Sequence, residues 1–177
     1  MSAPAHDVCG GDHRIALVAM RDEALRYWKT TALLAATVAA GAGLTAPVLL
    51  LQGRLAPDMF NLIRQVQIAT DQAKGGVARL AGQEPPKFDD IESSFADVKA
   101  RIAKTIAFLN SFRPEQIDGS EARDITLSVG GETMKFKGLD YLLAFVTPNI
   151  YFHVTTTYAI LRHNGLDVGK GDFLGSN

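Results

Sequence analysis

The sequence contains 177 residues, of which 47% are hydrophobic and 21% are charged, and its formal net charge is −1. This composition is typical of one folded domain with an apolar core and excludes an intrinsically disordered chain. Its lysines and arginines form no run, and the near-neutral charge gives no general attraction to nucleic acid, so we predict no nucleic-acid partner.

The single cysteine, Cys9, cannot form an intramolecular disulfide. It therefore indicates a reducing compartment, and we expect a cytoplasmic protein. Cys9 lies in the glycine-rich stretch DVCGGDH, where an inert, exposed thiol is the simplest interpretation. Cys9 and His13 could form half of a metal site, but no second pair of ligands follows at the spacing of zinc sites.

Residues 30–53, TTALLAATVAAGAGLTAPVLLLQG, contain no charged side chain. The stretch is long enough to cross a bilayer and follows several basic residues, as a membrane anchor would. However, it consists mainly of alanine, glycine and threonine, and Pro47 interrupts it. We therefore favour a buried or partly buried helix. A membrane tether formed by residues 30–52 and a cleaved segment are the alternatives.

The first predicted helix covers residues 15–40, and a short apolar connection from Leu44 to Arg54 follows. The second helix begins near Pro57, which is tolerated in a first turn because its missing N–H has no helical partner there. Asp58 places negative charge near the positive end of the helix dipole. Gly82 ends this helix. Its apolar residues recur at spacings of three and four and predict one buried face: Met59, Leu62, Ile63, Val66, Ala69, Ala73, Val77 and Leu80.

The stretch QEPPKFDD predicts a rigid loop, and the third helix follows from about Ile91 to Phe112. Asp89 or Asp90 is the expected N-cap. The apolar face of this helix is predicted to contain Ile91, Phe95, Val98, Ile102, Ile106 and Leu109.

Residues 123–137, RDITLSVGGETMKFK, alternate apolar and polar side chains on either side of Gly130-Gly131, which predicts a β-hairpin. The last helix covers residues 138–163, with Asn164-Gly165 at its end and a kink or break at Pro148. Four helices joined by short connections predict an all-α fold, an antiparallel four-helix bundle with a small β-hairpin between helices three and four.

Several stretches of the chain resemble a bacterial family of unknown function in the DinB-like superfamily, whose other members include metalloenzymes. The stretches that carry the resemblance are RLAPDMF (54–60), RQVQIATDQAKGGVARLAG (64–82), ITLSVGG (125–131) and PNIYFHVTTTYAILRHNGLDVGKGDFLG (148–175). The resemblance implies a four-helix bundle, often dimeric, so we expect a homodimer. We place residues 46–177 in this domain. Residues 1–45 form a segment that diverges from the family, either a first helix or the product of a reading-frame error.

Many DinB-like proteins bind a divalent metal through three histidines, and some are transferases that use low-molecular-weight thiols. By resemblance, His153 stands at the second of two histidine positions on the last helix, and Asn149 stands at the first. The third position, on the second helix, falls near Gln67 or Asp71. The resemblance therefore implies Asp71, Asn149 and His153 as ligands of a weak site for Zn, Ni or Mn.

Three interpretations of His153 are open: it is a packed histidine hydrogen-bonded to the second helix, a metal ligand, or a general base. We favour the packed histidine. His163 is about 80° around the same helix and about 15 Å away, so it cannot complete the site, and we interpret it as a helix-end residue. A small-molecule pocket, if present, would involve Gln67, Tyr151 and Thr157.

The function that the sequence favours is an uncharacterised DinB-like protein, non-enzymatic or with a degenerate metal site, that binds an unknown small molecule. One alternative is a divalent-metal-dependent thiol transferase or hydrolase-like enzyme that uses His153 with Asp71 and Asn149. The membrane-tethered bundle is the other alternative. The chain contains none of the motifs GxSxG, GxxxxGK[ST] or HExxH.

Overall fold

A computed structural model describes residues 47–174 of the chain. The predicted first helix at 15–40 and most of the uncharged stretch at 30–52 lie outside these residues. Within residues 47–174, no helix combines the length and the hydropathy needed to cross a membrane. The described residues form a mostly helical fold with one small antiparallel sheet of two strands. Because the first of the four predicted helices lies outside them, the four-helix count stays a prediction.

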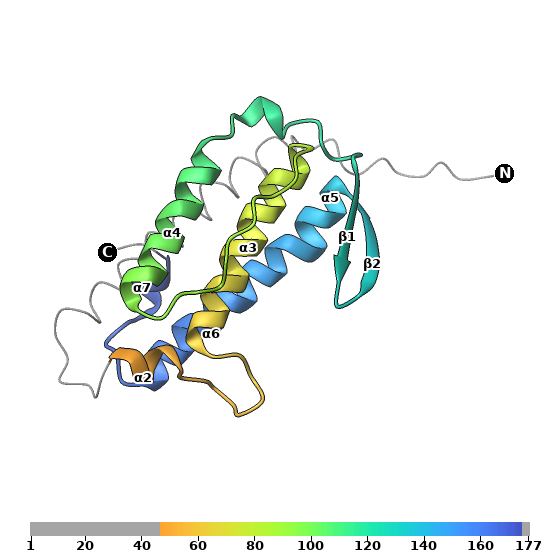
Figure 1. Ribbon diagram of the computed structural model, residues 1–177. Coiled ribbons are helices and arrows are strands. Elements are labelled where there is room, and N and C mark those ends of the chain that lie inside the picture. Colours follow the sequence, from red (N-terminus) through yellow and green to blue (C-terminus); the bar gives the residue numbers. More distant parts are fainter. Residues whose placement is uncertain (1–46, 175–177) are drawn as a thin grey trace.

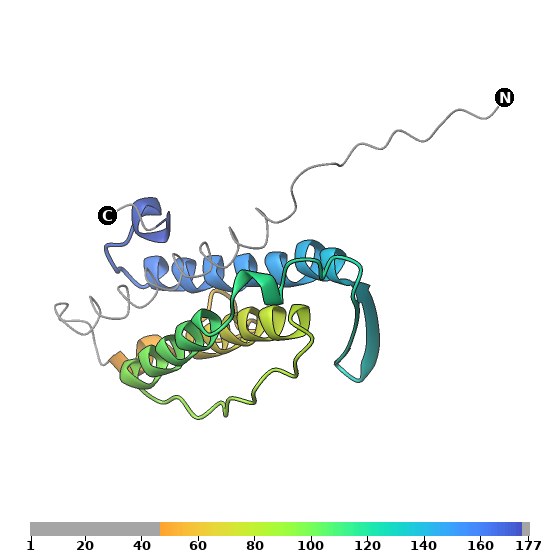
Figure 2. The ribbon, with the colours of Figure 1, turned by 90° about the horizontal axis from the view of Figure 1, so that it is seen from above.

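Three long helical segments form the body of the described structure (Figures 1 and 2). They are α3 (Leu62–Leu80), α4 (Phe95–Asn110), and a continuous segment made of α5 (Gly138–Asp140), the π-helical η2 (Tyr141–Val146) and α6 (Thr147–His163). The helix α3 is central, since it packs against both α4 and α6. Short helices complete the fold: α2 (Pro47–Leu51), the 3₁₀ turn η1 (Pro114–Gln116) and α7 (Lys170–Leu174).

The helix α3 begins later than its sequence predicts. The prediction placed the start near Pro57, but residues 53–61 form turns, and Asn61 is the N-cap. Its side chain accepts a hydrogen bond of 3.0 Å from the amide of Arg64, which satisfies one of the free N–H groups of the first turn. The predicted connection at 44–54 also contains a helix, α2, whose Leu51 is fully buried.

The start of α4 is also corrected by the structure. Neither Asp89 nor Asp90 caps it, and Ile91 is 82% exposed instead of lying on the buried face. The cap is Ser94, which forms a capping box with Asp97. The hydrogen bonds from Ser93 and Ser94 lower the pKa of the Asp97 carboxyl below its usual range. The two aspartates that were expected at the cap instead form ion pairs with basic side chains.

The predicted hairpin is confirmed as β1 (Asp124–Val129) paired with β2 (Glu132–Lys137). Gly130 and Gly131 have φ values of 60° and 88°, the left-handed conformation that a two-residue turn of this kind requires. Ile125 and Leu127 are buried, so one face of the hairpin packs on the helices.

The last helix is continuous from residue 138 to residue 163, and Pro148 does not break it. Proline has no N–H to donate, and its ring crowds the carbonyl four residues earlier. That carbonyl belongs to Ala144, which lies in the π-helical turn η2 directly before α6. The wider π turn gives the ring room. The predicted break at Pro148 is therefore wrong, and a π-helical segment precedes the proline instead.

The two mid-helix glycines of α3 differ in what surrounds them. A methyl group on Gly76 would lie 2.8 Å from Cγ1 of Val146, a buried branched side chain of η2. A methyl group on Gly75 would meet only the guanidinium end of Arg79, at 2.5 Å. Gly76 is therefore required for the close approach of α3 and η2, whereas Gly75 is not.

We expect Gly76→Ala to lower the free energy of unfolding by about 1 kcal/mol, because overpacking costs about 1–3 kcal/mol and alanine returns about 1 kcal/mol of helix propensity. Gly75→Ala is the matched control, since it displaces only the end of Arg79 and, with it, the hydrogen bond from Arg79 to Tyr141. The loss of that bond, about 1 kcal/mol, offsets the gain in helix propensity, so that the two variants differ by roughly 1 kcal/mol. Urea unfolding of both variants measures the difference. Equal stabilities would contradict the proposed contact.

Candidate functional site

His153 lies in the middle of α6 and is 7% exposed. Its Nδ1 is 2.6 Å from Oε1 of Gln65 on α3, and Nε2 of Gln65 donates a hydrogen bond of 3.1 Å to the carbonyl of Phe60. Because the amide nitrogen of Gln65 is used as a donor, its oxygen faces the imidazole, and Nδ1 of His153 must carry the proton. This contact with the second predicted helix is the one expected of a packed histidine.

The protonation state of His153 follows from its surroundings. Burial disfavours the charged imidazolium, and the positive charge of Arg64 adds to this, so the pKa of His153 is lowered from its ordinary value of 6.5. At neutral pH the ring is therefore neutral, with its proton on Nδ1 and a lone pair on Nε2.

Asp71 lies on the other side of α3, toward α4. Its Oδ1 accepts hydrogen bonds from Nζ of Lys74 at 2.8 Å and from Nη2 of Arg101 at 2.9 Å. Lys74 and Arg101 are both buried, whereas the Asp71 side chain is 40% exposed. The carboxylate that was expected to bind a metal thus pairs with two buried cations.

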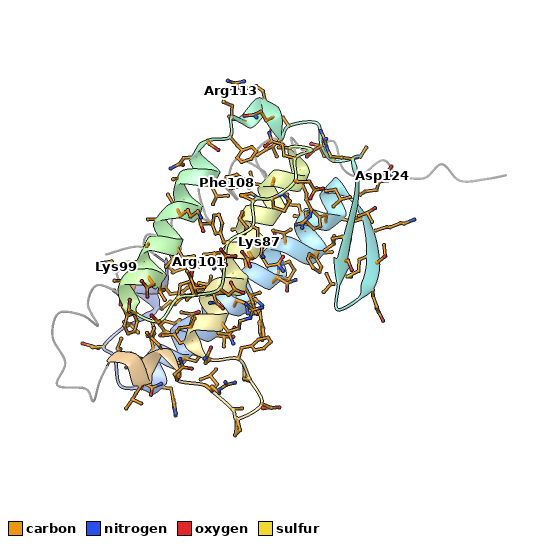
Figure 3. The ribbon with its side chains drawn as sticks, in the orientation of Figure 1. Lys87, Lys99, Arg101, Phe108, Arg113 and Asp124 are labelled. Carbon is orange, nitrogen blue, oxygen red and sulfur yellow. The ribbon has the colours of Figure 1, made fainter. Side chains whose placement is uncertain are left out.

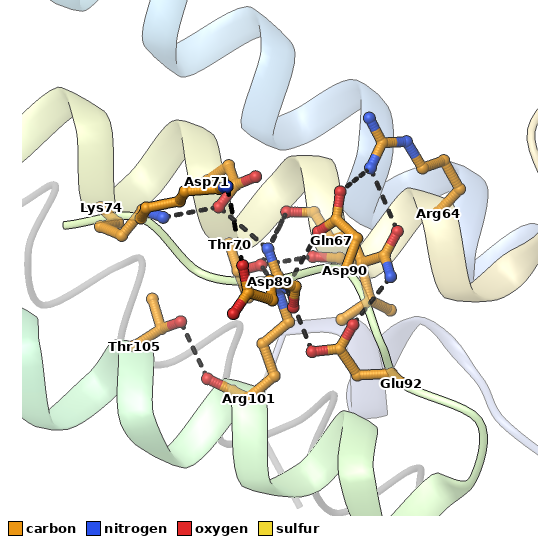
Figure 4. A network of polar contacts seen from close by, with 12 residues as sticks. Arg64, Gln67, Thr70, Asp71, Lys74, Asp89, Asp90, Glu92, Arg101 and Thr105 are labelled. Atoms are coloured by element: carbon orange, nitrogen blue, oxygen red, sulfur yellow. Dashed lines mark hydrogen bonds and ion pairs between the residues drawn. The ribbon is translucent and has the colours of Figure 1, made fainter. Parts of the chain in front are cut away.

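Arg101 of α4 is the centre of a polar network between α3, α4 and the connection between them, residues 81–94 (Figure 4). Its Nε donates to Oγ1 of Thr70 at 2.8 Å. Its Nη1 lies 3.1 Å from Oε1 of Glu92 and 3.1 Å from Oδ1 of Asp90, and donates to the carbonyl of Asp89 at 3.2 Å. The Arg101 side chain, which is 2% exposed, thereby holds the connection against both helices.

Gln67 belongs to the same network. Its amide nitrogen donates to Oε2 of Glu92 at 2.7 Å, and its oxygen accepts from Nη1 of Arg64 at 3.2 Å. Arg64 also pairs with Asp90. Gln67 is 5% exposed, and both polar atoms of its amide form hydrogen bonds within this network. The residue that was predicted to line a pocket thus helps to hold the two helices and the connection together.

The remaining predicted site residues lie along α6. Asn149 donates from Nδ2 to the carbonyl of Phe145 at 2.7 Å, and Thr157 donates to the carbonyl of His153 at 2.8 Å. Tyr151 is at the surface, 36% exposed, and His163 is exposed in the last turn. In the described part of the chain, no three or more His, Cys, Asp or Glu side chains converge on a point that could hold a metal ion. Cys9 and His13 lie outside the described residues.

Sequence reasoning missed the Arg101 network. The signal for it was a polar residue at core spacing, because Arg101 lies three residues after Val98 and precedes Ile102 on the apolar face of α4. It also missed Phe88, whose ring has Nζ of Lys74 at 3.9 Å and Nζ of Lys104 at 4.1 Å from its centroid.

An open cleft of about 440 Å³ adjoins this network, between the connection and α4. Its lining includes Phe88, Ile91, Arg101 and Lys104. The side chains of Gln67, Tyr151 and Thr157 do not line this cleft.

Comparisons with known proteins define the family. Residues 17–174 match the model of a domain of unknown function (DUF1993). This chain belongs to the DUF1993 family. The match begins at residue 17, within the segment that we expected to diverge, and the predicted boundary at 45/46 stays a prediction. No curated protein matches the chain.

A solved structure also resembles this DUF1993 protein, the crystal structure at 1.83 Å resolution of a DinB family member protein from Shewanella denitrificans. The two chains are 38% identical, with 92% of this chain and 89% of the other covered, and the TM-score is 0.69. The resemblance to a DinB-like family of unknown function, which the sequence motifs suggested, is therefore confirmed.

The Arg101 network predicts a large difference between two basic residues of α4, which lie on opposite sides of the helix (Figure 3). Arg101→Met should lower the free energy of unfolding by roughly 3 kcal/mol, because the Glu92 carboxylate stays buried without a counter-charge. This cost is at the lower end of the range for breaking a buried ion pair, because the carboxylates of Asp71 and Asp90 are partly exposed to solvent. Lys99→Met, at an exposed position, should change it by no more than about 0.5 kcal/mol. Urea unfolding measures both, and an equally mild effect of Arg101→Met would contradict the role assigned to the network.

Proposed function

We propose that this DUF1993 protein is a non-enzymatic DinB-like binding protein in which ion pairs and hydrogen bonds occupy the groups that serve as metal ligands in other DinB-like proteins. In this proposal the described helices form part of a four-helix bundle whose first helix lies in residues 15–40. The observation that carries the proposal is the sharing of Oδ1 of Asp71 between Lys74 and Arg101.

The charges around Asp71 support this view. Metal ligands are groups that present negative charge or lone pairs to a cation. A divalent ion at Asp71 would lie beside two buried positive charges, and it would compete with two hydrogen bonds of normal length. The residues present therefore do not suit a divalent metal.

The other two residues of the predicted ligand set support the same conclusion less strongly. Asn149 uses its amide nitrogen on the backbone of its own helix, which leaves only the weakly coordinating carbonyl oxygen. His153 keeps a lone pair on Nε2, and its hydrogen bond to Gln65 orients the ring as second-layer partners of metal ligands do. His153 is thus the one feature that favours the alternative, a metal-dependent transferase or hydrolase-like enzyme.

The cleft beside Arg101 supports the binding part of the proposal. Its volume of about 440 Å³ is in the range of small-molecule sites. Phe88 and the exposed Ile91 supply apolar surface, and Lys104 supplies an ammonium group that forms no ion pair among the described residues. Of the carboxylates in the lining, Glu92 pairs with Arg101, and Asp97 accepts from the Ser93 and Ser94 amides. We infer a small ligand with an apolar body and an acceptor that binds Lys104.

The metal content of untagged protein tests the proposal. We expect no stoichiometric divalent metal in the wild type, in His153→Ala, or in the matched control His163→Ala, even after incubation with zinc, nickel or manganese salts and dialysis. Mass spectrometry of the acid-digested protein provides the measurement. One metal per chain in the wild type and in His163→Ala, but not in His153→Ala, would overturn the proposal and support the metalloenzyme.

We also propose that the protein is a homodimer that pairs through the exposed side of η2 and α6. Residues 141–161 contain no charged side chain, although the segment is at the surface. Leu143 and Phe152 are 52% and 56% exposed on it. A long uncharged, partly apolar surface on a helix is typical of a protein interface.

We expect sedimentation velocity to show a dimer for the wild type and a monomer for Phe152→Asp, because the aspartate would bring a charge into the interface. Ile91→Asp is the control, since Ile91 is even more exposed but lies in the connection before α4. This variant should stay dimeric. A monomeric wild type, or dissociation of both variants alike, would contradict this interface.

A further inference from the structure

The strand β1 has one edge that no other strand covers among the described residues, because the sheet contains only β1 and β2. The turn has two residues, so Val129 and Glu132 form the hydrogen-bonded pair that closes it. Hydrogen-bonded and non-hydrogen-bonded pairs alternate along an antiparallel ladder. The N–H and C=O groups of Asp124, Thr126 and Ser128 therefore point away from β2.

This edge lines a cleft of about 450 Å³ beside the C-terminal end of α3. In Figure 1, β1 lies on the side of the hairpin that faces the helices, and β2 lies farther out. The cleft is lined by β1 residues 124–128 on one side, and by Arg79, residues 82–84 and Arg123 on the other. An extended segment that enters the cleft would meet the free backbone groups of β1.

The charges of the cleft favour an acidic occupant. The carboxylate of Asp124 is neutralised by Lys137, whose Nζ lies 2.6 Å away. The remaining charged side chains of the lining are Arg79, Arg123 and Glu84, which leaves one net positive charge.

Both arginines are positioned by their neighbours. Nη1 of Arg79 donates to the buried Tyr141 hydroxyl at 3.0 Å, and the Arg123 guanidinium packs where a side chain on Gly82 would lie. No carboxylate of the described residues pairs with either guanidinium.

The two edges of the hairpin differ in how they are protected. Proteins commonly block strand edges with charged side chains, especially lysine, to prevent pairing with other chains. The outward-pointing backbone groups of β2 belong to Thr133, Lys135 and Lys137, so two lysines disfavour the addition of a strand at that edge. The corresponding positions of β1 are Asp124, Thr126 and Ser128, which include no lysine. The edge without lysine is the one that lines the cleft.

We propose that this edge binds an extended acidic peptide segment of a partner protein, which adds to β1 as a third strand. The backbone groups of Thr126 and Ser128 form the ladder, and an acidic side chain of the segment pairs with Arg79 and Arg123. This site is separate from the cleft beside Arg101 and does not depend on the absence of a metal.

The probe is an acetylated, amidated and fluorescently labelled hexapeptide that alternates valine with glutamate, added to the full-length chain. We expect saturable binding by fluorescence anisotropy that weakens as salt is added. A matched peptide that alternates valine with lysine should not bind. Binding of both peptides alike, or of neither, would overturn the proposal.

A pair of proline variants tests the contribution of the backbone. Thr126→Pro removes an N–H that points into the cleft and leaves the pairing with β2 intact, so binding should be lost. Thr133→Pro removes the corresponding N–H at the outer edge of β2, which does not line the cleft, and binding should be retained. Circular dichroism and urea unfolding confirm that both variants fold. Equal affinities of the two folded variants would show that the peptide does not add to β1.

A second pair of variants tests the charge contribution. Arg123→Gln should weaken binding of the glutamate peptide by about tenfold, the usual effect of one charge-assisted hydrogen bond. Arg113→Gln changes an exposed arginine that does not line the cleft and should leave the affinity unchanged. If Arg113→Gln weakened binding as much as Arg123→Gln, the attraction would be a property of the whole surface and the proposed site would be wrong.

Discussion

The arrangement of α3, α4 and their connection depends on the ion pairs and hydrogen bonds of the Arg101 guanidinium. A buried arginine is costly unless its donors are paired, and here two elements pair them: α3 supplies Thr70 and Asp71, and the connection supplies the carboxylates of Asp90 and Glu92. Removing one partner of a buried ion pair leaves the other charge buried without a counter-charge. The network therefore fixes the position of the connection, and with it the cleft that Phe88 and Lys104 line.

The helix α3 carries two separate polar contacts to its two neighbours. Gln65 bonds to His153 on α6, and Thr70 and Asp71 bond to Arg101 on α4. The first contact joins neutral groups, whose burial costs less than that of charges. The second joins charged groups and is partly open to solvent at Asp71. Asp71 and His153 thus lie in different networks: the Asp71 carboxylate is shared by two cations, whereas His153 keeps a lone pair on Nε2.

The sequence predicted the elements better than their ends. The β-hairpin and the buried faces of α3 and α4 followed from periodicity, because burial imposes it directly. The ends of α3 and α4 did not, since Asn61 and Ser94 compete as caps with Pro57, Asp89 and Asp90, and only tertiary contacts decide among them. The partner of His153 was placed on the correct helix. The role of Arg101 was not foreseen, because its partners lie as many as thirty-four residues away in the chain.

The resemblance to DinB-like proteins implies that a metal joins the second and last helices in many relatives. In this protein the hydrogen bond between Gln65 and His153 joins the corresponding helices, α3 and α6. Burial and Arg64 keep the imidazole neutral, so the contact needs no counter-charge. A structural link between these helices can therefore persist without the chemistry that a metal provides. Packing accounts for the buried position of His153 and for its hydrogen bond to Gln65, so a histidine at this position is not by itself a sign of catalysis.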